Sequence, residues 1–136
     1  MEERKVVTCF LEYDSKILIL RRSKKVSTYR KRWAGVSGYI EKEADTQALI
    51  EIEEETKLRK EDVELIRKGG PLEIIDKEKG IKWWVHPYLF HVKDPGKIEI
   101  DWEHTETKWI KPTTINRFKT VPKLKETLDR VWKDDG

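Results

Sequence analysis

The chain has 136 residues, of which 40% are charged and 10% aromatic, with 29 basic against 26 acidic side chains. That length fits one compact domain over residues 1–136, and the aromatic content argues against intrinsic disorder. No apolar run approaches the roughly 20 residues that span a bilayer, and a single cysteine, Cys9, excludes an internal disulfide framework. We therefore expect a soluble, cytoplasmic domain without a membrane partner.

The first part of the chain predicts strands joined by a tight turn and a basic loop. Residues 6–12 and 16–20 are rich in β-branched and apolar residues and flank a polar turn, which is typical of a hairpin. Residues 22–32 are polar and basic and predict a loop. Residues 33–41 predict a strand whose two glycines allow close backbone approach.

An amphipathic helix is expected over residues 47–58, which contain neither glycine nor proline. Asp45 or Thr46 offers a side chain that can cap its first turn. At helical spacing four residues form one stripe, which we expect to face the core: Ala48, Leu49, Ile52 and Thr56.

The second half predicts further strands and a final helix. Glycine- and proline-containing turns separate five candidate strands: 63–67, 72–76, 81–92, 97–100 and 107–110. Pro122 is expected to begin a helix whose apolar residues recur at helical spacing: Leu124, Leu128, Val131 and Trp132. Several strands with two embedded helices predict an α/β (α+β) fold, a mixed β-sheet covered by helices.

Gln, Asn, Cys and Met occur once each, whereas Lys, Glu and Arg are abundant. This composition is typical of proteins from hyperthermophiles, which carry networks of surface ion pairs, so we expect a thermostable protein. The two signs of charge are interleaved and the net charge is only +3. The composition therefore gives only weak support to nucleic acid as a partner.

Carboxylates gather on one turn of the expected helix. Glu51, Glu54 and Glu55 stand at i, i+3 and i+4 and project from one side. Like charges at this spacing destabilise an isolated helix by about 0.2–0.5 kcal/mol per pair, and hard divalent cations prefer oxygen ligands of this kind. The alternative is an ordinary solvated acidic face, because runs of charge usually face water.

Residues 34–58, AGVSGYIEKEADTQALIEIEEETKL, resemble the Nudix box of the MutT-like pyrophosphohydrolases. Gly38 matches the first glycine of the box, Glu43 its loop glutamate, and residues 51–55 its helical glutamate core. Outside the box, residues 104–110 look like a later family segment that often ends in Trp followed by an aliphatic residue. The resemblance extends over nearly the whole chain.

The resemblance implies a Nudix-type α/β/α sandwich with a mixed β-sheet. It also implies Mg²⁺ or Mn²⁺ held by three carboxylates and one carbonyl: Glu51, Glu54, Glu55 and Gly38. The implied reaction is hydrolysis of a nucleoside diphosphate linked to another moiety, so the implied partner is a nucleotide-type small molecule. The sequence leaves a homodimer open.

Two residues depart from the box pattern, and the loop before the helix is short. Ile50 replaces the box arginine, and Lys57 replaces the glycine that ends the helix. In the family the arginine supports the metal-binding carboxylates, and loss of such outer support typically costs about 10–100-fold in metal affinity or activity. We therefore expect weakened chemistry. A non-catalytic Nudix-like domain that binds a nucleotide or an RNA end is the alternative.

Hydrolysis requires a general base to activate the attacking water. Related enzymes take it from the box or from a later loop, so the resemblance implies Glu106 first and Glu54 second as catalytic residues. Glu103 is close enough in the sequence to compete. The alternative for Glu106 is an ion pair with a lysine on a neighbouring strand.

The basic loop before the box is expected to hold phosphate groups, because arginine binds phosphate through two hydrogen bonds at once. Four residues of this region are expected to bind substrate: Arg22, Arg32, Trp33 and Glu41. Ordinary surface charge is the alternative for each basic residue taken singly.

Two adjacent tryptophans and three histidines remain. Trp83 and Trp84 point to opposite faces of their predicted strand. An uncovered indole would be free to stack on a base, but we expect helices to bury both. The histidines show no ligand spacing with one another, so we predict no special role for them: His86, His91 and His104.

Overall fold

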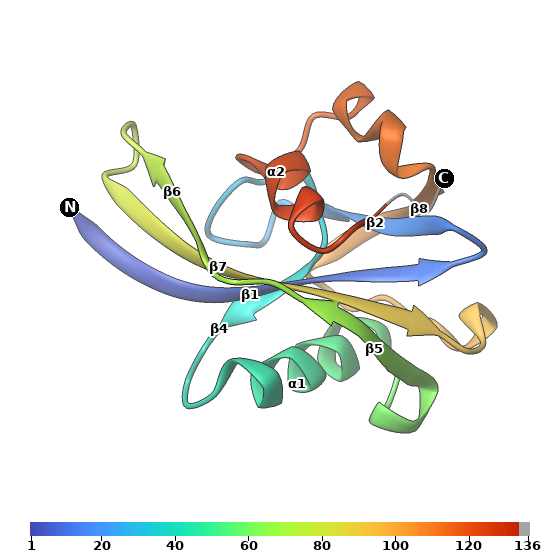
Figure 1. Cartoon of the computed structure of the whole chain (residues 1–136). Helices are drawn as coiled ribbons and strands as arrows, with labels where there is room; N and C mark the ends of the chain where they lie inside the picture. The colour runs from blue at the N-terminus through green and yellow to red at the C-terminus, as the bar shows by residue number, and fades with distance from the viewer. Residues whose placement is uncertain (134–136) are drawn as a thin grey trace.

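A mixed sheet of eight strands forms the centre of the protein in a computed structural model that describes residues 1–133 (Figure 1). Its two longest strands, β1 (Glu2–Tyr13) and β7 (Ile81–Val92), run parallel to each other, and all other pairings are antiparallel. The remaining strands are β2 (Lys16–Arg22), β3 (Trp33–Ala34), β4 (Val36–Tyr39), β5 (Val63–Lys68), β6 (Leu72–Asp76) and β8 (His104–Ile110). The central order is β3-β2-β1-β7-β5, while β4 pairs with β1, β6 with β7 and β8 with β2.

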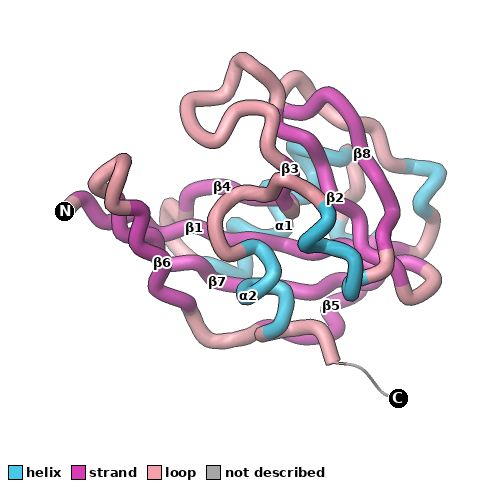
Figure 2. Tube along the Cα trace, turned by 90° about the horizontal axis from the view of Figure 1, so that it is seen from above, coloured by secondary structure: helices cyan, strands magenta, loops and turns pink. Residues whose placement is uncertain are grey.

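Helices cover both faces of this sheet. Helix α1 (Ala44–Thr56) packs on one face, and α2 (Leu124–Asp129) lies on the other (Figures 1 and 2). Three short 3₁₀ helices complete the chain: η1 (Lys60–Asp62), η2 (Pro95–Lys97) and η3 (Pro112–Arg117). The predicted α+β fold with a mixed sheet between helices is confirmed. Among the described residues, no helix is long and apolar enough to cross a membrane.

Strand β1 explains why the sheet needs cover on both faces. Residues 6–11 are all buried, and neighbouring side chains of a strand point to opposite sides. Val7, Cys9 and Leu11 enter the cluster under α1, where Ala48 and Ile52 also lie. Phe10, by contrast, belongs to the cluster under α2. A near-continuous apolar strand is therefore buried from both sides.

Several of the predicted strands differ from those in the structure. The strand expected over 33–41 is divided into β3 and β4 at Gly35, where a side-chain Cβ would lie only 3.0 Å from the Cys9 carbonyl oxygen. The strand expected over 97–100 is wrong: a 3₁₀ turn occupies its start, because the Asp94 carboxylate accepts a hydrogen bond from the Gly96 N–H at 2.9 Å. Strand β8 begins earlier than predicted, at His104.

Helix α1 begins and ends earlier than the sequence predicted. Its N-cap is Glu43, and the predicted cap Asp45 instead accepts hydrogen bonds from Lys68 and from the Tyr88 hydroxyl. The helix ends where Lys57 adopts the left-handed conformation with φ of 67° and donates its N–H to the Glu53 carbonyl at 2.9 Å. Lys57 thus takes the conformation that favours glycine, so the helix end survives the departure from the box pattern.

The end of helix α2 and the burial of Trp83 and Trp84 also differ from the predictions. The final helix ends at Asp129, so the buried Val131 follows it. The expected burial of Trp83 and Trp84 under helices is wrong, because the first half of β7 extends beyond both helices and pairs with β6. Trp83 lies in a third apolar cluster, and Trp84 is half-buried with its indole N–H bonded to Glu3.

Candidate active site

A cavity of about 650 Å³ lies beside α1. Four carboxylates contribute to its wall: Glu41, Glu51, Glu54 and Glu103. Four aromatic side chains line it as well: Tyr29, Tyr39, Trp83 and Trp102. Acidic groups next to aromatic rings make a cavity that can hold a cation and a flat ring together. Trp102, 61% exposed, was missed by the sequence analysis because it stands in an irregular segment without periodicity.

Glu51 is held rigidly at this cavity. Its side chain is buried, and the Gln47 amide donates a hydrogen bond of 2.7 Å to its carboxylate. Strand β4 brings Gly38 directly against it, so closely that a Cβ at position 38 would overlap the Glu51 carboxylate. Only glycine permits this approach without displacement. Burial raises the pKa of Glu51.

Glu55 lies one helical turn further on and is 1% exposed. One carboxylate oxygen stands 3.4 Å from His104 Nε2, and the other has no hydrogen-bond partner among the described residues. Burial, followed by the nearby charges of Glu103 and Glu51, raises the pKa of Glu55 well above its ordinary value. A buried acceptor without a partner costs about 1–3 kcal/mol, so the site favours a ligand that satisfies it.

His104 lies against Glu55, a contact that the sequence analysis did not predict. Its ring is buried between two carboxylates, with Nε2 near Glu55 and Nδ1 3.2 Å from Asp101 Oδ1. Burial lowers the pKa of His104, and the Asp101 carboxylate opposes that shift. His104 can therefore orient Glu55 as outer partners orient metal-binding side chains. Spacing could not reveal this role, because His104 is on β8 and Glu55 is on α1.

Of the three glutamates considered as general base, two line the cavity and one does not. Glu54 is exposed at the cavity wall, and Glu103 also lines it. Glu106 is not among the lining residues; its carboxylate lies 3.2 Å from Arg21 on the neighbouring strand β2, an ion pair with an arginine rather than the predicted lysine. Burial, with the charges of Asp101 and Glu51, raises the pKa of Glu103.

Of the four predicted substrate-binding residues, three line a cavity and one is buried elsewhere. Arg22 and Glu41 line the cavity, and Arg32 lines an adjoining one. Trp33 faces away: it is buried in the cluster under α2, where its ring meets Phe118 at 5.7 Å between centroids. Neighbouring strand residues point to opposite faces, so Ala34 lines the cavity in its place.

The family model described as NUDIX domain matches residues 2–131. The chain belongs to the Nudix family. Its structure is similar to a MutT protein from Methanosarcina mazei Go1, with a TM-score of 0.78, 18% identity and coverage of 95% of this chain and 92% of that one. It is also similar to an Ap4A hydrolase from C. elegans, with a TM-score of 0.73, 16% identity and coverage of 96% of this chain and 94% of that one. The E. coli dihydroneopterin triphosphate pyrophosphohydrolase is similar too, with a TM-score of 0.71, 15% identity and coverage of 95% of this chain and 96% of that one. No curated protein matches the sequence.

The Nudix box of this chain lacks its arginine, and Arg22 places a different cation nearby. Ile50 is 43% exposed at the cavity wall. Arg22, at the end of β2, donates hydrogen bonds to the Thr28 carbonyl oxygen at 2.9 Å and to the Thr28 hydroxyl. Burial lowers the pKa of Arg22, while the nearby Glu55 and Glu103 charges oppose that shift. Arg22 lines the same cavity as Glu51 and Glu54, so the site contains an arginine although the box does not supply it.

The donor set of this Nudix box suits a hard divalent cation. Within residues 1–133, no group of three or more His, Cys, Asp or Glu side chains is arranged so that it could hold a metal ion as it stands. Glu51 and Glu55 are nevertheless both buried and Glu54 is exposed, and within the described part of the chain one Glu55 oxygen has no partner. Carboxylate oxygens of this kind are the preferred ligands of Mg²⁺.

Proposed function

We propose that this Nudix protein is a divalent-metal-dependent pyrophosphohydrolase that cleaves a nucleoside diphosphate linked to another moiety, with Mg²⁺ or Mn²⁺ as cofactor. The observation that carries the proposal is the buried oxygen of Glu55, which has no hydrogen-bond partner within residues 1–133 and lies next to the buried Glu51, beside a cavity with aromatic walls. The names of two similar structures, an Ap4A hydrolase and a dihydroneopterin triphosphate pyrophosphohydrolase, agree with a phosphoanhydride substrate.

Three glutamates would hold the cation, and the surrounding residues would orient them. Glu51, Glu54 and Glu55 supply carboxylate oxygens, and the Gly38 carbonyl adds one from the facing strand. When bound, the cation neutralises charge on the phosphate oxygens and makes water more acidic. Outside the ligands, the amide of Gln47 fixes Glu51.

Glu103 is the residue we propose as general base. It lines the cavity, and burial raises its pKa, which makes the carboxylate a stronger base at neutral pH. This choice places Glu103 ahead of Glu106, which is engaged with Arg21, and ahead of Glu54, which we assign to the metal.

The aromatic wall is suited to a nucleobase. Tyr39 and Trp83 stack with 6.2 Å between ring centroids and an interplanar angle of 23°, and Tyr39 is 50% exposed. The Arg4 guanidinium lies 5.4 Å from the centroid of the Trp83 ring and donates a hydrogen bond of 3.0 Å to the Tyr39 hydroxyl. An exposed ring backed by a second ring is a rigid stacking surface, so we propose that the base lies against Tyr39, with Arg22 and Glu41 contacting the rest of the substrate.

The test of metal dependence compares two variants of one helix. Glu54→Gln with Glu55→Gln should abolish Mn²⁺ binding in a calorimetric titration and all hydrolysis across a screen of nucleoside diphosphate derivatives. Glu53→Gln is the matched control, because Glu53 is exposed on the same helix and does not line the cavity. Unchanged Mn²⁺ binding in the double variant would refute the metal assignment.

The test of the base compares Glu103→Gln with Glu106→Gln. General base catalysis contributes about 10²–10⁴-fold, so Glu103→Gln should lower kcat by at least about 100-fold while metal binding persists. A comparable loss in Glu106→Gln alone would return the assignment to Glu106. Tight nucleotide and metal binding with no hydrolysis of any substrate would instead support the alternative, a non-catalytic binding domain.

A further inference from the structure

The basic loop, residues 23–32, forms part of the wall of the cavity beside α1 although it belongs to no strand or helix. Residues 25–29 all line that cavity. Val26 is the one apolar side chain of the loop that is buried. A segment with so little buried apolar surface opens easily, so the hydrogen bonds of the loop determine where it lies.

Two neighbouring residues tie this loop to the rest of the protein. Within the described chain, residues 24–30 form hydrogen bonds outside the loop only through Thr28 and Tyr29. Thr28 accepts two from Arg22, at 2.9 Å to its carbonyl oxygen and at 3.3 Å to its hydroxyl. The Tyr29 hydroxyl donates one of 2.6 Å to Asp76 and accepts one of 3.0 Å from the Trp83 indole. The loop therefore connects an arginine of the cavity to the sheet.

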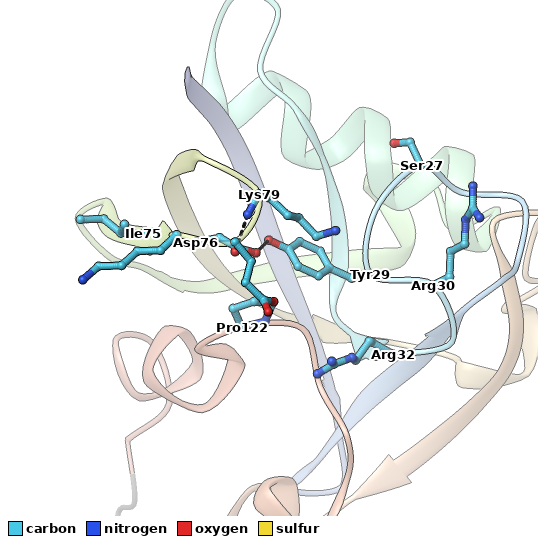
Figure 3. A pocket seen from close by; sticks show the side chains of 10 residues that line it. Ser27, Tyr29, Arg30, Arg32, Ile75, Asp76, Lys79 and Pro122 are labelled. Carbon is cyan, nitrogen blue, oxygen red and sulfur yellow. Dashed lines mark hydrogen bonds between the residues drawn. The ribbon is translucent and has the colours of Figure 1, made fainter. Parts of the chain in front are cut away.

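The sheet side of this connection is rigid. Asp76 is the last residue of β6, and its second carboxylate oxygen accepts a hydrogen bond of 3.1 Å from the Lys79 N–H in the turn to β7. Trp83 lies in β7, where it is buried and stacks on Tyr39. Figure 3 shows the Tyr29 ring directed from the loop towards Asp76. Tyr29 thus anchors the loop to two strands that are paired with each other.

The backbone of the loop needs such an anchor. Tyr29 has φ of 48° and Lys31 has φ of 65°, which is the left-handed region that side chains other than glycine disfavour. Such conformations persist only where the surroundings hold them. The two hydrogen bonds of the Tyr29 hydroxyl supply that hold. Without them the loop can relax, and Thr28, the preceding residue, then moves away from Arg22.

We propose that Tyr29 is a positioning residue, whose anchored hydroxyl holds the basic loop in place and thereby keeps the Arg22 side chain in the cavity beside α1. Arg22 lines this cavity together with Glu51 and Glu54. If Thr28 moves, the long arginine side chain loses the two bonds that direct it and can turn towards water. The effect of Tyr29 on turnover rests on the proposed function, whereas the anchoring of the loop does not.

Limited trypsin digestion, followed by mass spectrometry, tests the anchor. Tyr29→Phe removes only the hydroxyl and should speed cleavage within the loop at least about 10-fold, because cleavage follows the open population and the lost bond has a charged acceptor. Tyr13→Phe is the matched control, because Tyr13 is exposed, lies outside the cavity and, among the described residues, has no hydrogen bond to its hydroxyl. Equal cleavage of wild type and Tyr29→Phe overturns the proposal. The sites to follow are Lys24, Lys25, Arg30 and Lys31.

Substitutions of Asp76 test the same anchor from its other end. Asp76→Ala should release the loop as Tyr29→Phe does, so the result does not depend on one variant. Asp76→Asn should stay within about 3-fold of wild type, because an amide can still form a hydrogen bond with the Tyr29 hydroxyl. Cleavage of Asp76→Asn as fast as that of Asp76→Ala contradicts this hydrogen bond as the anchor.

The NMR signal of the Arg22 Nε–H reports the positioning directly. The signal is assigned by its absence in Arg22→Gln, and its exchange with water should be slow in wild type and in Tyr13→Phe, because Nε donates to the Thr28 carbonyl oxygen. Exchange should be at least about 10-fold faster in Tyr29→Phe. Unchanged exchange in a variant whose loop is released overturns the role of Tyr29 as a positioning residue.

Kinetics then separate this proposal from the proposed function. Tyr29→Phe should lower kcat/KM about 10-fold, and combining it with Arg22→Gln should cost no more than Arg22→Gln alone, because both act through one guanidinium. Losses that add overturn the proposal. If no substrate is hydrolysed, the proposed function fails, while trypsin digestion and the Arg22 signal still decide whether Tyr29 positions Arg22.

Discussion

Replacing Gly38 by alanine tests the geometry on which the site depends. The new Cβ would overlap the Glu51 carboxylate, which is buried and bonded to Gln47, so either Glu51 or strand β4 must move. Such overpacking destabilises the folded protein by about 1–3 kcal/mol. Replacing glycine by alanine also lowers the conformational entropy of the unfolded chain, which stabilises the folded protein by about 0.4–1 kcal/mol. The free energy of unfolding in EDTA should therefore fall by about 1 kcal/mol. A displaced Glu51 should also weaken Mn²⁺ binding by at least about 10-fold.

Gly70→Ala is the matched control for this substitution. A Cβ at position 70 would meet no atom within 4 Å, and the backbone there lacks a positive φ. The control should be as stable as wild type or more stable by up to about 1 kcal/mol, with unchanged metal affinity. Urea unfolding in EDTA and calorimetric titration with Mn²⁺ measure the two effects. If Gly38→Ala binds Mn²⁺ as tightly as wild type, the placement of Glu51 as a ligand opposite Gly38 is refuted.

Four further outcomes are expected. Hydrogen bonds from Lys68 and Tyr88 hold the pKa of Asp45 below its ordinary value, so Asp45→Asn should lower the unfolding free energy at pH 7 by about 0.5 kcal/mol. In urea titrations that difference should vanish as the pH falls through the lowered, folded-state pKa, where the aspartate loses its charge. Lys57→Gly should stabilise by about 0.5–1 kcal/mol in the same assay, because Lys57 adopts a left-handed φ of 67°. Arg22→Gln should lower kcat/KM by about 10-fold or more. Ile50→Arg should change kcat/KM little, because the Arg22 guanidinium already supplies a positive charge at the site. A large gain in kcat/KM for Ile50→Arg would contradict this. Thermal unfolding should lie above the range of about 45–65 °C that is common for mesophilic domains, and a midpoint near 50 °C would disprove the thermophilic interpretation of the composition.

Local patterns were sufficient for much of the fold. The apolar runs of β1 and β2 and the polar turn between them predicted the hairpin, and the spacing of Ala48 and Ile52 predicted the buried face of α1. Glu51, Glu54 and Glu55 fall on one turn because helical geometry depends only on neighbours in the sequence. Element boundaries were less predictable: Asp45 is drawn from the capping position by its tertiary partners Lys68 and Tyr88.

The tertiary structure decided which distant residues surround those carboxylates. His104 reaches Glu55 from another strand, Arg22 stands beside the box from the end of β2, and Trp102 enters the cavity wall from an irregular segment. The adjoining cavity that Arg32 lines likewise requires the loop after β2 to meet the β6–β7 turn through Tyr29 and Asp76. None of these contacts has a period or spacing in the sequence, because each depends on how separate elements pack. The chain by itself specifies the helix that carries the acids, whereas packing specifies the histidine, the arginine and the cavity that act on them.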